Sequence, residues 1–297
     1  MKYLKIVYVV LVLVVIGCDT KDSSTILNQI ITEYQEYETY DEEEYPLGVY
    51  TKKHHKSEAE YAQTILDKLN QINGDGLSET DRISLDLLRF KLKDQIAYYE
   101  FEQYLNPLLS DYGFHSSLTY NVRPLTNYED VKKYLNTLNA IPEYVNQHFV
   151  NLREGLEKGV SQPLVIFKGY ESTYDSNIVD NYEDSYYYSP FKTLPKELTE
   201  ELKDSVLTAA KVAIETNVTP EFKRIKQFFE TEYFTKTRTT IGISETPNGE
   251  AFYQDRINFY TTSTQYTADD IHKIGLSEVV RIKGEMEKII VDLEFKG

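Results

Sequence analysis

The chain has a single cysteine, no tryptophan and only two methionines among its 297 residues. One cysteine cannot form an internal disulfide, so a secreted form must be stable without one. The formal charge is −16, with 48 acidic and 32 basic residues and no basic stripe, which argues against a nucleic-acid partner. The sequence also lacks a Gly-rich phosphate loop, a Gly-x-Ser-x-Gly elbow and any internal repeat, so nucleotide hydrolysis and serine-hydrolase chemistry have no support.

The apolar run at the amino terminus is too short to span a bilayer. Lys2 and Lys5 precede eleven apolar residues, Ile6 to Ile16, whereas a spanning helix needs about 20. This pattern is typical of a signal peptide, here residues 1–17. Val15-Ile16-Gly17-Cys18 resembles the lipobox of bacterial lipoproteins, in which the cysteine sulfur is acylated and becomes the new amino terminus. The alternative is ordinary signal-peptidase cleavage beside an incidental cysteine.

Acylation of Cys18 would anchor the chain to a membrane surface, since each buried methylene contributes about 0.8 kcal/mol. Residues 18–25 are small and polar and are predicted to form the lipidated tether, and residues 26–297 the helical domain. Loss of residues 1–17 removes two lysines and moves the formal charge from −16 to −18. The sequence thus predicts a bacterial envelope lipoprotein whose acidic body lies outside the cytoplasm. It leaves open the choice of inner or outer membrane and the oligomeric state.

The body is predicted to be mainly α-helical and rich in helical hairpins. Residues 57–73 and 78–104 are predicted to form an antiparallel pair, because Gly74-Asp75-Gly76 breaks the chain and Ser78, with Asp81, caps the second helix. Residues 127–158 are predicted to form another helical hairpin, capped by Asn127 and with Pro142 at or near a helix start or kink.

Two later helices, residues 195–216 and 219–235, are predicted to be separated at Asn217, because a threonine cap followed by proline starts the second one. The β-branched residues within 238–245 leave a short β segment open. The Tyr-rich stretch 169–191 would either line a substrate cleft or pack across helices, and packing is the favoured interpretation.

The histidines give no metal-binding pattern. Lys52 to Lys56 is predicted to be an exposed basic loop, and its neighbours His54 and His55 do not share a helix face, which disfavours a zinc pair. His115 and His148 are interpreted as loop or core residues.

The clearest helical period lies near the carboxyl end. Thr267 is the expected N-cap, with Asp269 and Asp270 in the first turn, where the helix dipole favours negative charge. Apolar residues then recur at steps of three and four, and such a stripe must face a core. They are Ile271, Gly275, Val279, Ile282, Met286, Ile289 and Leu293.

The preceding helix has an unusual face. Tyr253, Arg256 and Tyr260 are spaced by three and four residues, so a guanidinium is predicted to lie between two phenols. Phe252 and Phe259 flank that face and are expected to anchor it. A row of hydroxyls follows where the chain leaves the helix.

The order of residues in these last two helices resembles the bacterial domain of unknown function 885 family. Three upstream motifs also resemble it: Tyr128-Glu129-Asp130, Ile141-Pro142-Glu143-Tyr144 and the stretch from Leu152 to Gly159. The resemblance runs from about Glu36 to the last residue. The matching positions near the carboxyl end are Gly249, Tyr253, Arg256, Thr261, Thr262, Thr267, Asp270, Ile271, His272, Gly275, Leu276, Glu278, Val279, Arg281, Ile282, Glu285 and Met286.

The resemblance implies the helical part of a zincin-like metallopeptidase fold, in proteins about twice as long. There a His-Glu-x-x-His helix binds zinc, because two imidazoles one turn apart share the ion while the glutamate activates water. No histidine of this chain begins such a motif, so no catalytic and no metal residue is expected in it, and zinc is expected only in a full-length family protein. The resemblance implies an amino-terminal part, truncated before the metal-binding helix and inactive alone.

Two functions remain open at this point. The chain is either the amino-terminal part of a lipid-anchored, zinc-dependent peptidase-like protein, or a non-catalytic helical lipoprotein that binds a peptide or protein partner. In the first case Arg256 would grip a peptide carboxylate bidentately, or else be a structural residue stacked between tyrosines. The residues expected to shape a cleft for a peptide substrate are Tyr253, Arg256, Tyr260 and Thr261.

The last helix is expected to lack part of its partner in a chain of this length. Apolar side chains cost about 1.5 to 3 kcal/mol each when they are left exposed. The sequence therefore predicts marginal stability or association through that stripe.

Overall fold

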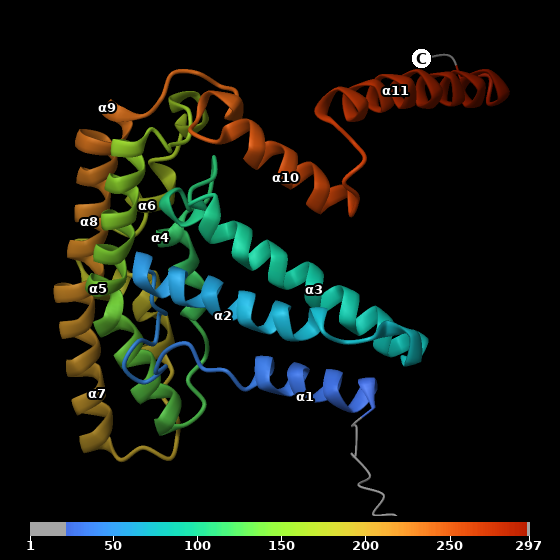
Figure 1. Ribbon diagram of the computed structural model, residues 1–297. Coiled ribbons are helices and arrows are strands. Elements are labelled where there is room, and N and C mark those ends of the chain that lie inside the picture. The colour runs from blue at the N-terminus through green and yellow to red at the C-terminus, as the bar shows by residue number, and fades with distance from the viewer. Residues whose placement is uncertain (1–21, 296–297) are drawn as a thin grey trace, which may run out of the picture.

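The computed structural model describes residues 22–295, and regular structure in this part of the chain is helical (Figure 1). The mainly α-helical class is confirmed. The short β segment left open near 238–245 is wrong: these residues are irregular and end in a 3₁₀ turn, Ile243–Glu245. The helices are α1 (Ser23–Gln35), α2 (Lys52–Asn70), α3 (Glu79–Glu100), α4 (Phe114–Ser117), α5 (Tyr128–Lys158), α6 (Ser172–Asp175), α7 (Glu200–Ala213), α8 (Thr219–Phe228), α9 (Phe234–Lys236), α10 (Gly249–Thr261) and α11 (Ala268–Asp292).

Helices α1, α2 and α3 form a layer with its own small core (Figure 1). The predicted antiparallel pair is confirmed as α2 and α3, and Ser78 caps α3 by accepting from the backbone N–H of Asp81. The expected basic loop is wrong, because α2 already begins at Lys52, capped by Thr51. A cation in a first turn opposes the helix dipole, and the carboxylate of Glu154 offsets this by pairing with Lys52 at 2.7 Å.

Helix α5 is one continuous helix of 31 residues, so the predicted hairpin at 127–158 is wrong, although Asn127 is the cap as expected. Proline lacks the N–H for the bond to the carbonyl four residues earlier and usually kinks or breaks a helix. The helix continues through Pro142 because its apolar face is buried on both sides of the proline, as at Leu138 and Val145.

The predicted break at Asn217 is also wrong. Residues 200–236 form one unbroken helical rod, in which α7, α8 and α9 are joined by π-helical turns at Ile214–Val218 and Phe229–Tyr233. A π-turn widens the helix by one residue. The first one ends two residues before Pro220 and makes room for a ring that a regular α-helix would exclude.

Helix α5 and this rod run parallel. Asn139 bonds to Asn217 at 2.8 Å, Arg224 to Asn146 at 2.7 Å, and Arg153 to Glu232, so residue numbers rise together along both helices. Parallel neighbours need a long return connection. The segment between them, which includes the Tyr-rich stretch, runs back along the pair.

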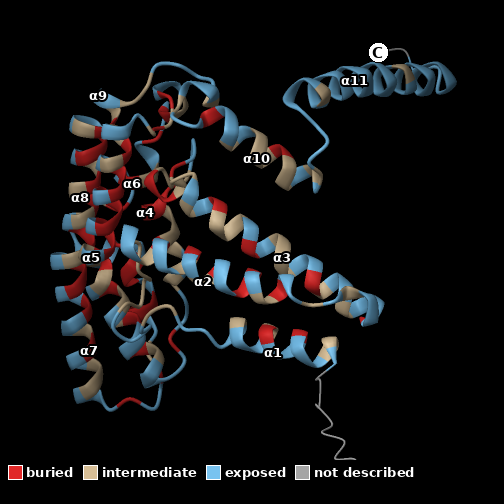
Figure 2. Ribbon diagram, in the orientation of Figure 1, coloured by how far each residue is buried: buried red, intermediate tan, exposed pale blue. Residues whose placement is uncertain are grey.

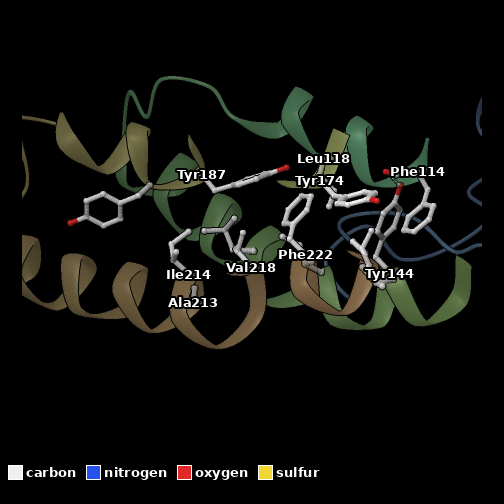
Figure 3. Packing of buried hydrophobic residues seen from close by; sticks show 14 of the residues in the cluster. Phe114, Leu118, Tyr144, Tyr174, Tyr187, Ala213, Ile214, Val218 and Phe222 are labelled. Atoms are coloured by element: carbon white, nitrogen blue, oxygen red, sulfur yellow. Dashed lines mark hydrogen bonds between the residues drawn. The ribbon is translucent and has the colours of Figure 1, made fainter. Parts of the chain in front are cut away.

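The Tyr-rich stretch 169–191 packs into the main core, as favoured from the sequence. Tyr174 lies against Phe229 and Tyr187 against Phe222 of the rod, with ring centroids 5.9 and 5.7 Å apart. Figure 3 shows Tyr187 next to Phe222, with Tyr174 in the same core cluster. The hydroxyl of Tyr134 donates to the carbonyl of Tyr187 at 2.8 Å, which fixes the return segment to α5.

Helix α11 stands apart from the body and is exposed along its length (Figures 1 and 2). Its start is as predicted, with a capping box between Thr267 and Asp270. None of its residues is buried; Val279 and Met286, for example, are 65 and 58% exposed. The expectation that this stripe faces a core is wrong for residues 22–295.

Candidate functional site

Helix α10 lies against α3 through two aromatic pairs. Phe259 stacks on Phe90 with centroids 4.8 Å apart, and Phe252 meets Phe101 at 5.7 Å. The anchoring role expected for Phe252 and Phe259 is confirmed. At the start of α10, a Cβ on Gly249 would lie 1.8 Å from the carbonyl oxygen of Ile243, so only glycine allows this close seat.

Arg256 bridges the two helices. Its Nη2 donates to Oδ1 of Asp94 on α3 at 2.7 Å, and its Nε donates to Asp255 at 3.0 Å. Burial opposes the charged form, since the side chain is only 19% exposed. The bonds to Asp255 and Asp94 outweigh it, so the pKa of Arg256 is raised and the guanidinium stays charged.

The two phenylalanines flank Arg256, and the predicted sandwich between phenols is not what the structure shows. The guanidinium carbon lies 4.9 Å from the ring centroid of Phe259 and 5.7 Å from that of Phe252. Tyr253 and Tyr260 are 49 and 79% exposed. The residue spacing correctly predicted that two phenylalanines, two tyrosines and the arginine share helix α10. It did not reveal which rings contact the guanidinium, because that depends on how α10 packs against α3.

The hydroxyl row closes the carboxyl end of α10. The hydroxyl of Thr261 donates to the carbonyls of Ile257 and Ser263, at 2.7 and 3.1 Å. The next residue, Thr262, has a φ of 51°, in the left-handed region that β-branched residues rarely enter. Such positions persist where surrounding structure enforces them and are enriched at functional sites. At this strained turn, called the elbow, the chain leaves the body and continues into α11.

Two hollows lie along the seam between α3 and α10. The first, of about 500 Å³, contains Asp94, Asp255 and Arg256 together with the elbow and is called the charged hollow. The second, of about 430 Å³, is lined by Tyr98, Phe252 and thirteen further residues without an ionisable carboxyl, amino, guanidinium or imidazole group, and is called the neutral hollow. Sequence reasoning missed the second one, because its walls come from five separate segments.

Two histidines are buried in the main core. His115 is fully buried and His148 is 3% exposed, and burial lowers the pKa of each to about 3. His115 Nε2 lies 2.8 Å from the hydroxyl of Thr173. Both ring nitrogens of His148 lack a hydrogen-bond partner, and the ring stacks on Phe114 at 4.6 Å. The prediction that both are loop or core residues is confirmed, and both lie in the core.

Within residues 22–295, no three histidine, cysteine, aspartate or glutamate side chains gather as they would around a metal ion. The described side chains therefore do not fit the zinc ion that the family resemblance implies. Nor is any helix in this range long and apolar enough to cross a membrane. The expected acylation site, Cys18, lies outside the described residues.

A family model, described as "Bacterial protein of unknown function (DUF885)", matches residues 34–297. The chain belongs to this family. The match begins two residues before the predicted start of the resemblance. No curated protein matches the chain.

A similar fold is seen in the crystal structure of a "putative lipoprotein" from Colwellia psychrerythraea. It matches this DUF885 chain with a TM-score of 0.76 at 17% sequence identity. The match covers 93% of this chain and 52% of the solved one. At that identity the likeness shows the fold alone. This chain spans about half the length of its solved neighbour.

Proposed function

We propose that this chain is the helical, amino-terminal half of a lipid-anchored, peptidase-like envelope protein. The observation that carries the proposal is α11, an amphipathic helix of 25 residues with none buried. A stripe such as Ile282, Val279 and Met286, each 46% exposed or more, requires a covering surface. The fold matches only 52% of its solved neighbour, which leaves a second half to supply that surface.

In this proposal the two halves form one body, and α10 lies at the seam between them. Tyr253, Arg256, Tyr260 and Thr261 then border the cleft, as expected from the sequence. Asp94 and Asp255 both bind the guanidinium of Arg256, so two negative charges already face one positive charge. We therefore assign Arg256 the task of holding α10 on α3, and not that of gripping a peptide carboxylate. Zinc, if bound, would be held by side chains outside this chain.

The first experiment is to read the gene beyond the codon for Gly297 and express the complete reading frame. We expect a continuing frame that encodes a His-Glu-x-x-His helix, bound zinc and peptide hydrolysis. Ile282→Asp in that protein should separate the halves and abolish hydrolysis, whereas Lys283→Asp, on the polar side of α11, should not. An immediate stop codon, or a zinc-free product of the complete frame, would refute the peptidase proposal.

Membrane anchoring is tested separately. The support is the lipobox-like sequence before Cys18 and the fold shared with a protein named as a lipoprotein. Cells grown with labelled palmitate should yield an acylated protein in the membrane fraction, and Cys18→Ser should abolish both label and sedimentation. Labelling that survives Cys18→Ser would show that the anchor lies elsewhere.

A second candidate function is binding without catalysis. It is favoured by the neutral hollow, whose fifteen lining residues include no Asp, Glu, Lys, Arg or His. A complete reading frame that lacks a zinc motif but still captures peptides would support this function over the peptidase.

A further inference from the structure

A third hollow lies between two short segments of the chain. Its wall comes from residues within 111–120 and 172–177, with Tyr186 of the return segment at its border, and it is called the hydroxyl hollow. Helices α4 and α6 belong to these segments and lie side by side (Figure 1). Its volume of about 590 Å³ is within the range of small-molecule sites, which is about 300 to 1,000 Å³. Of the described residues, Tyr112 alone also lines the neutral hollow, so the two are separate sites.

Every described residue that lines the hydroxyl hollow has a side chain that can form hydrogen bonds. Eight of the ten carry a hydroxyl group, one an amide and one a carboxylate, and none of the ten is aliphatic or basic. A wall of this kind favours an occupant with many polar groups over a lipid or an aliphatic side chain, because polar groups lose free energy when they are buried without partners. The single carboxylate, with no cation in the wall, disfavours an anion.

The amide of Asn177 has no partner although the residue is nine-tenths buried. Asn177 is 9% exposed, and its side chain makes no hydrogen bond within residues 22–295. Its amide atoms keep accessible surface, unlike the hydroxyl of Ser116 in the same wall, which is sealed in the core. Buried polar groups are nearly always paired in folded proteins, and an amide offers both donors and an acceptor. A ligand in the hollow can reach this amide and pair with it.

Neighbouring contacts fix the position of Asn177. Its backbone N–H donates to the carbonyl of Tyr174 at 3.1 Å, and the ring of Tyr174 lies against Phe229 of the rod. The two walls of the hollow are joined by His115 and Thr173, whose Nε2 and hydroxyl oxygen are 2.8 Å apart. The amide is therefore held in place before a ligand arrives, which reduces the entropy cost of binding.

Two tyrosine rings at the border of the hollow are exposed. Tyr120 is 66% and Tyr186 is 53% exposed, and the ring centroid of Tyr120 lies 6.5 Å from that of Tyr112. The hydroxyls of Tyr120 and Tyr186 make no hydrogen bond within the described range. A tyrosine side chain combines an apolar face with a polar edge. The C–H face of a sugar ring packs on such a surface while its hydroxyl groups reach the polar wall.

We propose that the hydroxyl hollow binds a neutral saccharide, with a sugar ring on the exposed tyrosines and its hydroxyls bonded to Asn177 and Asp111. Two adjacent sugar hydroxyls supply the acceptor and the donor that an amide requires. The carboxylate of Asp111, which has no hydrogen bond or ion pair within residues 22–295, accepts from a further hydroxyl. This binding function goes beyond those proposed above and depends neither on zinc nor on the lipid anchor.

The test is an NMR titration of the nitrogen-15-labelled full chain with three neutral disaccharides: cellobiose, N,N′-diacetylchitobiose and maltose. At least one of them should shift the amide signals of residues 111–120 and 172–177, with a dissociation constant on the order of 1 mM, given typical affinities per ligand atom. The amide signal of Leu69, in the core of the α1–α3 layer, should not move.

Substitutions test the amide and the rings separately. Asn177→Ala should weaken binding about fivefold, the effect of one neutral hydrogen bond. Asn70→Ala, at an exposed asparagine that ends α2, is the matched control and should not change binding. Tyr120→Ala should also weaken binding about fivefold, whereas Tyr120→Phe keeps the ring and should retain most of the affinity.

The chemistry of the ligand tests the charge and the aromatic face. Glucuronate should bind more weakly than methyl glucoside because of its repulsion from Asp111, and Asp111→Asn should remove that difference. Sorbitol, which carries hydroxyl groups without a ring face, should bind at least about tenfold more weakly than methyl glucoside. Choline tests the alternative use of exposed tyrosines beside a carboxylate, which is to bind a cation, and should not bind.

Several outcomes would overturn the proposal: no shift with any of the three disaccharides at 10 mM, shifts centred outside the hollow, equal affinity of the wild type, Asn177→Ala and Tyr120→Ala, or binding of choline in place of the sugars. Should Asn177→Ala fail to fold, Tyr120→Ala at an exposed position and the ligand series still decide. Neither zinc nor acylation enters this assay, so failure here leaves the anchored-peptidase proposal standing.

Discussion

Acidification should destabilise the protein through its two core histidines. The pKa of His115 and of His148 is lowered to about 3 by burial, whereas an exposed imidazole in the unfolded chain titrates near 6.5. As the pH falls through 6.5, the unfolded chain takes up protons that the folded chain refuses. Stability is therefore complete above pH 6.5 and is lost progressively as the pH falls toward 3.

The expected magnitude follows from these two pKa values. Between pH 7 and pH 5, each buried imidazole should lower the free energy of unfolding by about 2 kcal/mol, so the pair should lower it by about 4 kcal/mol. Carboxylates whose pKa is lowered, such as Glu154 and Glu232 through their hydrogen bonds to Lys52 and Arg153, add their own loss only below pH 4.5. The pH interval from 4.5 to 6.5 therefore separates the two core imidazoles from these two carboxylates.

The measurement is urea unfolding followed by circular dichroism at pH 8, 7, 6 and 5. His148→Phe keeps the stack on Phe114 and removes two unpaired nitrogens, so it should reduce the loss between pH 7 and pH 5 by about 2 kcal/mol. Its effect on packing is read separately at pH 8, where imidazoles are neutral in both states. A wild-type stability that is flat from pH 7 to 5, or a variant with the wild-type slope, would refute the burial argument.

Three further substitutions, the first with a control variant, probe the layer and the seam. Leu69→Ala, fully buried between α1, α2 and α3, should cost about 3 kcal/mol in urea unfolding, whereas Leu87→Ala, 63% exposed on α3, should cost under 1 kcal/mol. Gly249→Ala forces a methyl against the carbonyl of Ile243 and should raise the rate of amide hydrogen exchange throughout α10. Exchange at the wild-type rate would contradict the close contact between Gly249 and Ile243. Arg256→Lys cannot span both carboxylates and should also speed exchange in α10, with little change in α5; equal protection would show that the aromatic pairs suffice.

Capping and periodicity predicted the helices where local chemistry decides the outcome. Asn127, Ser78 and Thr267 were all identified as caps, because each accepts from a backbone N–H three residues later. The breaks assigned near Pro142 and Pro220 failed for one reason. A proline removes a single hydrogen bond, and burial of the helix on both sides of it outweighs that loss.

Tertiary partners explain most of what the sequence could not reveal about the seam. The spacing of Tyr253, Arg256 and Tyr260 fixes a helical face but carries no information about Asp94, which lies far away in the chain and binds the guanidinium at 2.7 Å. The neutral hollow gave no signal at all. It forms only when the fold brings the turn at Gln103 together with residues from other segments, such as Val160 and Phe252.

Helix α11 shows where a periodic pattern stops being informative. The period identifies which side of a helix is apolar, since residues three and four apart share a face, but it does not say where the covering surface lies. Because the start of α11 is fixed by its own capping box, the helix is specified locally and forms without that surface. The left-handed backbone of Thr262 directs it outward at the elbow. The stripe is thus an apolar surface that residues 22–295 leave exposed.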